Sequence, residues 1–576
     1  MSKIVKYSII LLTEIAVFVT MCLCMKQYDL EHETRMAGFT AQSTEEVEEA
    51  GWIIQAQAGK AGPPAFTPHA VESTAPEQYL LSWETMVDGE ALSIPSEYES
   101  RNPFGDIRFD LGSEYTRKEG VFTFRGNNFR DNPVYGRTNY EIGSLVEKWS
   151  AQSGALSYKD AVWSGSGWTG QPLIRKWDER TKQHMNMHDW AKNKEDLVEV
   201  IYACMDGFIY FLDLETGQET RERLWLGFTF KGAGALDPRG YPVMYVGAGY
   251  DSAKGHARVF ILNLLDCSVM REFGNDDPFG LRGTLSYFDS SALVDAETDT
   301  LIYPGENGVL YLLHLGTTYH AETGELSMTF DRSVKWRYRG KRTTIEKYWP
   351  GMETSAAIYQ NYLFIADNGA NLICLDLNTL KPVWVQDILD DSNSTPVLSM
   401  ENGHLYLYVS TSFHLGWRST TTAVIPVWKI DAETGEVVWK TEFECSTLKG
   451  VSGGVQSTIA LGQRELKDQI YVTVAMSHGT YGGDIIAMKK EDGSTLWGKQ
   501  ISYTWSSPVC VYDKDGKGEV LYATSEGVLY AVDGLTGNEK SRIRISTGNV
   551  EASPAVYENM LVVGTRAGRI YGIGLQ

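Results

Sequence analysis

The stretch GVLYAVDGLTGNEK, residues 527–540, decides the fold of this chain. Its segment VLYAVD is typical of a β-strand, and the following GLTG is typical of a turn. Similar strings stand at residues 207–220, 370–384 and 423–439, and a looser copy stands at 483–497. Copies of this kind indicate a repeat architecture, in which each unit buries its apolar face against its neighbours.

Each unit also carries two strands before the repeated string. A small-residue entry leads into a short first strand, as in SSPVCVY at residues 506–512, and a second strand ends in small residues, as in VLYATSEG at 520–527. The repeated string supplies the third strand and a turn, and a tryptophan often follows on a fourth. Four short strands joined by turns predict one blade of a β-propeller.

The third strands recur at intervals of 41 to 62 residues, which is close to the period of known propeller repeats with insertions. Their predicted starts are Gly207, Ala257, Gly308, Ala370, Ala423, Gly483, Gly527 and Gly568. We therefore predict an all-β chain with eight four-stranded antiparallel blades. The last unit lacks an outer strand after its third strand, so we expect residues 145–154 to supply it and close the ring.

The chain divides by sequence into four parts. They are a signal or transmembrane anchor at 1–25, a disordered stalk at 26–76, a lead-in at 77–144 and the propeller at 145–576. The apolar run at 7–25 follows Lys3 and Lys6 and approaches the ~20 residues that cross a bilayer. We expect a single-pass cell-membrane protein with an extracytoplasmic propeller. An uncleaved anchor, a cleaved signal and a lipid anchor at Cys22 remain open.

The composition argues against nucleic acid as a partner, because the net charge is −22 and phosphate binding needs lysine and arginine. The cysteines beyond the anchor are scattered singly, which is not the pattern of a disulfide framework or a zinc site. DKDGKGE at 513–519 offers Asp513, Asp515 and Glu519 as oxygen ligands for Ca²⁺, with a plain polar turn as the alternative.

The repeat carries an Asp-x-x-Thr-Gly-x-x-x-Trp pattern, which Asp431, Thr434, Gly435 and Trp439 match in full. This pattern resembles the repeat of the pyrroloquinoline-quinone-like β-propellers, and FRGNNFRDN at 124–132 resembles the lead-in found before such propellers. In that family the tryptophan docks between blades. The resemblance therefore implies a structural role for three tryptophans, namely Trp384, Trp439 and Trp497.

The family contains two functional classes, and fold alone does not choose between them. Quinoprotein dehydrogenases hold the quinone in the central funnel with Ca²⁺ and a catalytic Asp, and many carry adjacent cysteines. The other class binds partners and includes an outer-membrane assembly lipoprotein. This chain has no cysteine pair after the anchor, and no residues match the dehydrogenases' Asp base, calcium carboxylate and floor tryptophan. We therefore expect resemblance to the non-enzymatic members, with no catalytic residue and no cofactor. A dehydrogenase using pyrroloquinoline quinone and Ca²⁺ is the alternative.

One face of the propeller is expected to carry the functional loops. The loops entering first strands and those joining second to third strands share this face, and most are long and rich in Trp, Tyr, His, Gly and Ser. The residues predicted to gather there are Trp168, Tyr250, Trp349, His414, Trp417, Arg418, His478, Tyr481 and Trp505. Exposed aromatics on such loops favour recognition of an envelope protein, peptide or glycan. The structural alternative is that they fill the funnel or pad blade contacts.

Overall fold

The computed structural model describes residues 66–92, 104–167, 170–344, 347–414, 417–418 and 420–576. The predicted anchor and most of the predicted stalk lie outside these residues. From Thr67 onward the chain forms one compact unit. Among the described residues, no helix is both long enough and apolar enough to cross a membrane.

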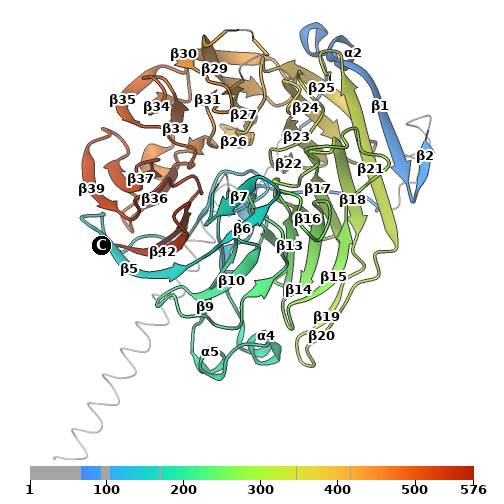
Figure 1. Cartoon of the computed structure of the whole chain (residues 1–576). Helices are drawn as coiled ribbons and strands as arrows, with labels where there is room; N and C mark the ends of the chain where they lie inside the picture. The colour runs from blue at the N-terminus through green and yellow to red at the C-terminus, as the bar shows by residue number, and fades with distance from the viewer. Residues whose placement is uncertain (1–65, 93–103, 168–169, 345–346, 415–416, 419) are drawn as a thin grey trace, which may run out of the picture. The chain divides into compact units, whose positions relative to one another are not determined.

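Eight antiparallel sheets stand around a central axis in the described part of the chain, so the predicted eight-bladed propeller is confirmed (Figure 1). Blade 1 holds β3 (Gly120–Val121), β8 (Leu173–Lys176), β9 (Val198–Ala203), β10 (Phe208–Asp213) and β11 (Leu224–Trp225). Blade 2 holds β12 (Ala235–Leu236), β13 (Val243–Gly247), β14 (Val259–Asn263) and β15 (Ser268–Phe273). Blade 3 holds β16 (Leu293–Asp295), β17 (Thr300–Pro304), β18 (Val309–His314) and β21 (Arg332–Gly340), with β1 (Leu80–Val87) and β2 (Glu90–Leu92) added outside. Blade 4 holds β22 (Ala357–Tyr359), β23 (Tyr362–Ala366), β24 (Asn371–Asp376) and β25 (Lys381–Asp387).

The second half of the ring repeats this plan. Blade 5 holds β26 (Val397–Glu401), β27 (His404–Ser410), β29 (Thr422–Asp431) and β30 (Val437–Ser446). Blade 6 holds β28 (Ser412–Phe413), β31 (Gly453–Gly454), β32 (Ala460–Leu461), β33 (Gln469–Ala475), β34 (Gly482–Lys489) and β35 (Thr495–Ser502). Blade 7 holds β36 (Val509–Tyr512), β37 (Gly518–Ala523), β38 (Val528–Asp533) and β39 (Glu539–Arg544). Blade 8 holds β40 (Ala555–Tyr557), β41 (Met560–Thr565), β42 (Arg569–Leu575), β4 (Val134–Tyr135) and β5 (Leu145–Gln152).

Short elements fill the connections between blades. Two hairpins are formed by β6 (Ala155–Tyr158) with β7 (Ala161–Ser164) and by β19 (Thr318–His320) with β20 (Glu325–Ser327). The helical turns are η1 (Glu72–Thr74), α2 (Pro76–Tyr79), η2 (Gly112–Glu114), α4 (Glu179–His184), α5 (Asp189–Asn193) and η3 (Arg464–Leu466). The third strand of every blade begins within two residues of its predicted start, so the repeat count from sequence is confirmed.

The ring closes as predicted through β5, which pairs antiparallel with β42 and completes blade 8. The register places Trp149 opposite Gly572 and Leu145 opposite Leu575. The strand that closes the ring therefore comes from the start of the propeller sequence, while its partners come from the end. This arrangement leaves blade 8 with no missing outer strand.

Tryptophans on outer strands dock on the turn of the next blade. Trp384 donates from Nε1 to the carbonyl of Ala432 at 3.0 Å, and its indole lies against Gly435. Trp149 makes the same contact, with Leu214 as acceptor at 2.8 Å. A Cβ on Gly435 would meet the indole at 2.6 Å, and Gly435 has φ +73°, so both packing and backbone require glycine there. Trp439 and Trp497 dock in the same way, as the resemblance implied.

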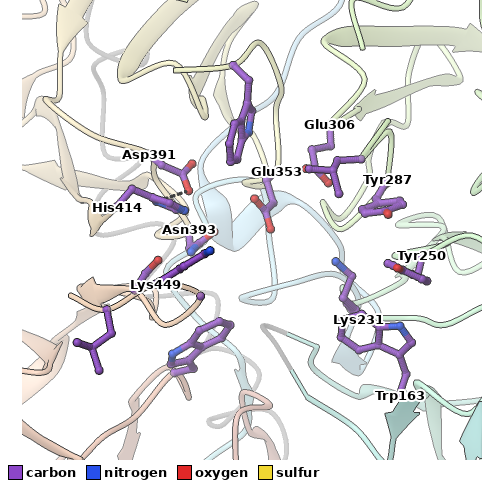
Figure 2. Close-up of a pocket in the computed structure, with 16 residues that line it drawn as sticks. Trp163, Lys231, Tyr250, Tyr287, Glu306, Glu353, Asp391, Asn393, His414 and Lys449 are labelled. Carbon is purple, nitrogen blue, oxygen red and sulfur yellow. Dashed lines mark ion pairs between the residues drawn. The ribbon is translucent and has the colours of Figure 1, made fainter. Parts of the chain in front are cut away.

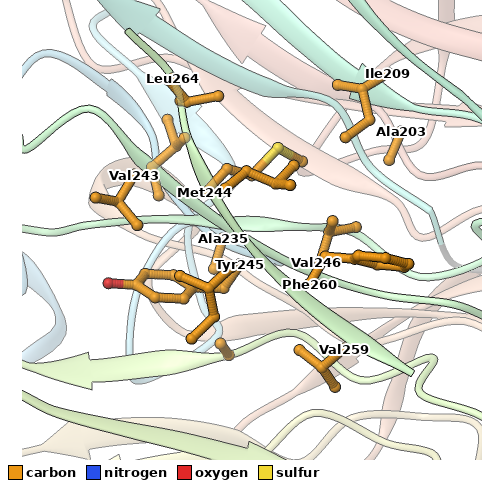
Figure 3. Close-up of a cluster of buried hydrophobic side chains, with 14 of the residues drawn as sticks. Ala203, Ile209, Ala235, Val243, Met244, Tyr245, Val246, Val259, Phe260 and Leu264 are labelled. Atoms are coloured by element: carbon orange, nitrogen blue, oxygen red, sulfur yellow. The ribbon is translucent and has the colours of Figure 1, made fainter. Parts of the chain in front are cut away.

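Each blade is apolar on both faces because it packs between two neighbours. In blade 2 every residue of β13 is buried (Figure 3). Met244 and Val246 belong to one continuous cluster with Ala203 and Ile209 of blade 1. The apolar core is therefore divided into clusters that lie between neighbouring blades, and each blade contributes to the clusters on its two sides.

Serine and threonine hydroxyls join the blade entries into a chain around the axis. The amide of Ser291 donates to the hydroxyl of Ser355 at 2.8 Å, and the amide of Ser355 donates to Thr395 in the next blade at 3.1 Å. The series continues from Thr395 to Thr458, Ser507 and Ser553, and ends at the carbonyl of Gly170 in blade 1. The small-residue entries seen in the sequence thus have a physical reason: each supplies a hydroxyl to the preceding blade.

The lead-in crosses the axis and bonds to many blades. Phe129 accepts from Leu398 of blade 5 at 3.0 Å, and Pro133 accepts from Val556 of blade 8 at 3.1 Å. Arg125 donates to the carbonyl of Pro508 of blade 7 at 2.9 Å. Arg130 donates to Ala356 of blade 4 at 2.7 Å. The segment from 120 to 135, which the sequence left without a role, therefore plugs the ring.

The residues before the plug pack on the outside of the propeller. β1 pairs with β21 and extends blade 3 by one strand. The amide of His69 donates to Glu433 at 2.8 Å, and the hydroxyl of Thr74 donates to Thr434 at 2.7 Å. Residues 67–76, which the sequence assigns to the stalk, are therefore part of the folded unit.

Arg130 is fully buried and donates to Ala356, Thr123, Phe124 and Ser291, which ties the plug to blades 3 and 4. We expect Arg130→Met to lower the free energy of unfolding by about 3 kcal/mol, because it leaves buried acceptors without donors. Urea unfolding measures the change. Arg117→Met, at a side chain that is 90% exposed, is the control. Equal urea midpoints for the two variants would contradict this role of the plug.

The hydroxyl chain generates a second prediction. Ser507→Ala removes the acceptor for the amide of Thr458, and both residues are fully buried. We expect a loss of about 1–3 kcal/mol of unfolding free energy. Ser157→Ala, at an exposed position of β6, should change it by less than about 0.5 kcal/mol. Denaturant unfolding of both variants checks the prediction, and an unaffected Ser507→Ala would rule out a stabilising role for this bond.

Candidate functional site

A cavity of about 390 Å³ opens on the axis, on the face that carries the blade entries. Its lining comes from loops of most blades and from β7 (Figure 2). The lining residues are Trp163, Lys231, Tyr250, Leu285, Tyr287, Glu306, Trp349, Glu353, Asp391, Asn393, His414, Leu448, Lys449, Gly450, Ser452 and Trp505. We call this cavity the funnel.

The structure brings four of the nine predicted recognition residues into the funnel, namely Tyr250, Trp349, His414 and Trp505. Trp417 lies behind them, stacked on His414 with ring centroids 4.6 Å apart. Arg418 is also behind the wall, with Nε 2.8 Å from Asp390. These six residues therefore lie in the funnel lining or directly behind it, and their role in recognition stays a prediction.

Two further predicted residues, His478 and Tyr481, are not among the lining residues. His478 pairs with Asp484 at 3.0 Å, away from the lining. Tyr481 is 85% exposed. Trp168 lies outside the described residues.

The polar residues at the floor of the funnel were not predicted from the sequence, although the blade entries contain a pattern that indicates them. In an extended entry, alternate side chains point to the same side, so the residue two before a ring hydroxyl faces the axis. The residues two positions before Ser355, Thr395 and Ser507 are Glu353, Asn393 and Trp505. All three line the funnel. Asp289 and Gln456 stand in the same place, and they bond to the lining residues Lys231 and Asn393.

Carboxylates dominate the floor. One amide nitrogen, Asn368 Nδ2, donates to Glu353 at 3.0 Å and to Asp391 at 2.7 Å. The two carboxylates therefore lie close together. Glu306 pairs with Arg282 at 3.0 Å, and Asp289 pairs with Lys231 at 2.7 Å. Figure 2 shows Glu353 between Asp391 on one side and Glu306 on the other.

Burial and mutual repulsion make these carboxyl groups hard to ionise. Burial, followed by the charge of Glu353, raises the pKa of Glu306 to about 8. The same two causes raise the pKa of Asp391 well above its usual value. Burial also raises the pKa of Asp289 to about 6, although Lys231 opposes the shift. Glu306 therefore holds a proton at neutral pH, and a bound cation would displace it.

His414 does not neutralise this charge. Its Nδ1 lies 3.3 Å from Asp391, but burial lowers the pKa of the imidazole to about 4. The ring is therefore neutral at neutral pH, and it lies edge-on to Trp349 and stacked on Trp417.

The walls of the funnel are aromatic. Trp163, Tyr250 and Tyr287 form one group, with ring centroids 5.1 and 5.2 Å apart between neighbours. The ammonium of Lys231 lies 5.0 Å from the ring of Tyr287, so a cation already occupies this side. On the opposite side, Trp349 contacts Trp417 edge-to-face at 5.0 Å.

Exposed apolar side chains lie on the loops that form the funnel mouth. Leu285 and Leu448 are each 44% exposed and line the cavity. Val451 and Leu389, on neighbouring entry loops, are each 38% exposed. We call these four leucine and valine residues the apolar rim. Large apolar side chains that are left in water around one cavity favour contact with a partner.

No metal centre is found among the described residues, where no three His, Cys, Asp or Glu side chains are placed to hold an ion. This corrects the calcium loop considered at 513–519. Asp513 accepts hydrogen bonds from the amides of Asp515 and Lys517, both at 2.9 Å, which makes it the cap of a polar turn. Glu519 is buried and accepts instead from the amide of Ile142 at 3.0 Å.

Comparisons with known proteins agree with the repeat pattern. The family model described as outer membrane protein assembly factor BamB matches residues 334–507 and 482–575. A search among curated proteins gives no match.

Among solved structures, the quinohemoprotein alcohol dehydrogenase of Comamonas testosteroni is similar, at 13% identity and a TM-score of 0.50 over 83% of this chain and 84% of that one. The quinohemoprotein alcohol dehydrogenase ADHIIG of Pseudomonas putida HK5 is similar at 10% identity and a TM-score of 0.54, over 82% of each chain. BamB from Moraxella catarrhalis has 14% identity and a TM-score of 0.42, over 75% of this chain and 98% of that one.

At these identities the two dehydrogenase structures show the fold alone. The family match, the Asp-x-x-Thr-Gly turns and the tryptophan docking concern the repeats themselves. The matched part of the chain, residues 334–575, therefore consists of repeats similar to those of the pyrroloquinoline-quinone-like β-propellers.

Proposed function

We propose that this chain is a non-catalytic binding or scaffolding propeller, which receives a protein or peptide segment at the funnel on the extracytoplasmic side of the cell membrane. The observation that carries the proposal is the apolar rim around an acidic funnel with aromatic walls. Leu285 and Leu448 belong to both the rim and the cavity lining, so a partner that covers the rim also reaches the funnel.

The plug supports a binding role. Residues 120–135 cross the axis and bond to the inner ends of the blades, so the funnel has a rigid floor. A site on a rigid scaffold, reached through loops, is suited to selective binding. The envelope location rests on the apolar run at 7–25 and on the family match, whose name refers to outer membrane assembly.

The alternative, a quinoprotein dehydrogenase, does not fit the residues of the funnel. Pyrroloquinoline quinone carries three carboxylates and needs cations around it. Lys231 and Arg282 are already paired with Asp289 and Glu306, and His414 is neutral. The remaining floor offers Glu353 and Asp391, which supply acceptor oxygens and no cation for a quinone carboxylate. The five described cysteines are not among the lining residues.

Photo-crosslinking tests the partner proposal. A benzophenone amino acid at Leu448 should give one discrete crosslinked product in cells that make this protein. The same probe at Leu535, which is 43% exposed on the turn after β38, is the matched control and should give none. The product should decrease at least fivefold when Leu285→Asp is added, because a charge disrupts the apolar rim. Equal products at Leu448 and Leu535 would reject the proposal.

A titration with pyrroloquinoline quinone and Ca²⁺ tests the alternative. We expect no saturable change in the tryptophan fluorescence of the full-length protein and no reduction of dye with alcohols or sugars. Trp349 and Trp505 lie in the funnel wall, so a quinone bound there would quench them. Saturable quenching together with substrate-dependent dye reduction would make the protein an oxidoreductase and overturn our proposal.

A further inference from the structure

We infer that the funnel binds a primary ammonium group, the side chain of a lysine in the partner segment, between Glu353, Asp391 and Asn393. The inference rests on the proposed function, because the partner supplies the lysine. It adds the chemical group that enters the cavity and the residues that select it.

The first argument is the position of the two carboxylates. Glu353 Oε2 and Asp391 Oδ1 accept from the same nitrogen of Asn368, at 3.0 and 2.7 Å, so this amide holds the two carboxyl groups side by side in the cavity lining. Glu353 comes from the loop before β22 and Asp391 from the loop before β26, so two blades hold the pair rigidly. An ammonium with three donors suits acceptors that converge from several directions.

The second argument is an acceptor that has no partner. Asn393 is 9% exposed, and its Nδ2 donates to Gln456 at 2.8 Å. This bond fixes the amide and leaves Oδ1 buried without a hydrogen bond among the described residues. Figure 2 shows Asn393 at the cavity, beside Asp391 and His414. A buried carbonyl without a donor costs about 1–3 kcal/mol, and a ligand donor would remove this cost.

The third argument is the distribution of charge. The cations nearest the floor are already engaged: Lys231 with Asp289, Arg282 with Glu306 and Arg418 with Asp390. Among the described residues, Glu353 and Asp391 have no lysine or arginine within ion-pair distance. The floor therefore lacks a cation where its carboxylates are closest together. Lys449 lies at the exposed mouth of the funnel rather than on this floor.

The fourth argument is the wall beside this gap. His414, which lies 3.3 Å from Asp391, is neutral and contacts the ring of Trp349 edge-on, and Trp505 also lines the cavity. Aromatic faces attract an organic cation and also cover the methylene groups of a lysine side chain. The buried indole N–H of Trp349 has no acceptor among the described residues, and a peptide carbonyl would supply one. A peptidyl lysine thus offers the donors, the apolar stem and the acceptor that this site lacks.

The experiment measures binding of Nα-acetyl-lysine N-methylamide to the full-length protein by tryptophan fluorescence and ligand-observed NMR. Its Nε-acetylated form is the matched ligand control, since it has the same stem without the charge. We expect the charged probe to bind at least tenfold more tightly. Equal binding of both probes, or binding of neither up to 50 mM, would overturn the inference.

Substitutions locate the site. Glu353→Gln and Asp391→Asn should each weaken binding of the charged probe at least tenfold, because each removes one charge and keeps the shape. Asp276→Asn, at a carboxylate that is 67% exposed outside the lining, is the control and should leave binding unchanged. If one floor variant does not fold, the other decides. Unchanged binding in a folded floor variant would contradict the inference.

The pH dependence gives a readout that does not need a variant. Glu306 faces Glu353, Arg282, Lys231 and Asp289, and its raised pKa of about 8 means that it holds a proton at neutral pH. Asp391 faces Glu353, Asp390, Glu306, Asn368 and His414, and its pKa is raised as well. The lysine ammonium stays charged to about pH 10. The affinity for the charged probe should therefore increase at least threefold from pH 6 to pH 9. An affinity that does not change with pH would contradict the inference.

These results separate the two proposals. A crosslinked partner at Leu448 without binding of the charged probe would support the proposed binding function and reject the ammonium site. Binding of the charged probe without any crosslinked partner would support the ammonium site and reject the proposal of a protein partner. Binding of neutral sugars in place of the probe would overturn the inference in favour of a glycan.

Discussion

The chain of hydroxyl contacts at the blade entries is the constraint on which the rest of this structure depends. The entries of blades 4 to 8 each present a serine or threonine hydroxyl to an amide of the blade before, at 2.8 to 3.3 Å. These groups are buried, so an unpaired one would be costly. The contacts hold neighbouring blades together at the axis, and the apolar clusters and the docked tryptophans join the same blades farther out.

The same constraint places the candidate site. Because the entries are extended, the residue two positions before each hydroxyl points toward the axis, where Glu353, Asn393 and Trp505 lie. The hydroxyl residue that bonds to the neighbouring blade and the residue that faces the funnel therefore belong to one short motif, two positions apart. Recognition can change at one position while the hydroxyl two residues later keeps the blades together. A propeller built this way can vary its ligand without altering its scaffold.

The sequence predicted what is local and repeated. Eight third strands and the closing strand β5 follow from period and strand pattern, and the docking of Trp384 was implied by the resemblance to the pyrroloquinoline-quinone-like repeat. It did not predict the acidic floor, because Glu306, Glu353 and Asp391 are far apart along the chain and meet only when the ring is closed. Nor did it predict the plug, since the contacts of Arg125 and Arg130 are with backbone carbonyls, which have no sequence signature.

The pairing of β5 with β42 has a consequence for how this protein reaches its native state. Gln152 and Gly568 are hydrogen-bonded partners separated by 416 residues. Contacts between such distant residues are slow to form, and blades that await closure expose unpaired strand edges. During synthesis, blade 8 must therefore wait for β42, while the plug already needs carbonyls from blades 3, 4 and 7. The native ring is an all-or-none product of the complete chain, and its assembly time, rather than the stability of any one blade, sets the period of exposure to aggregation.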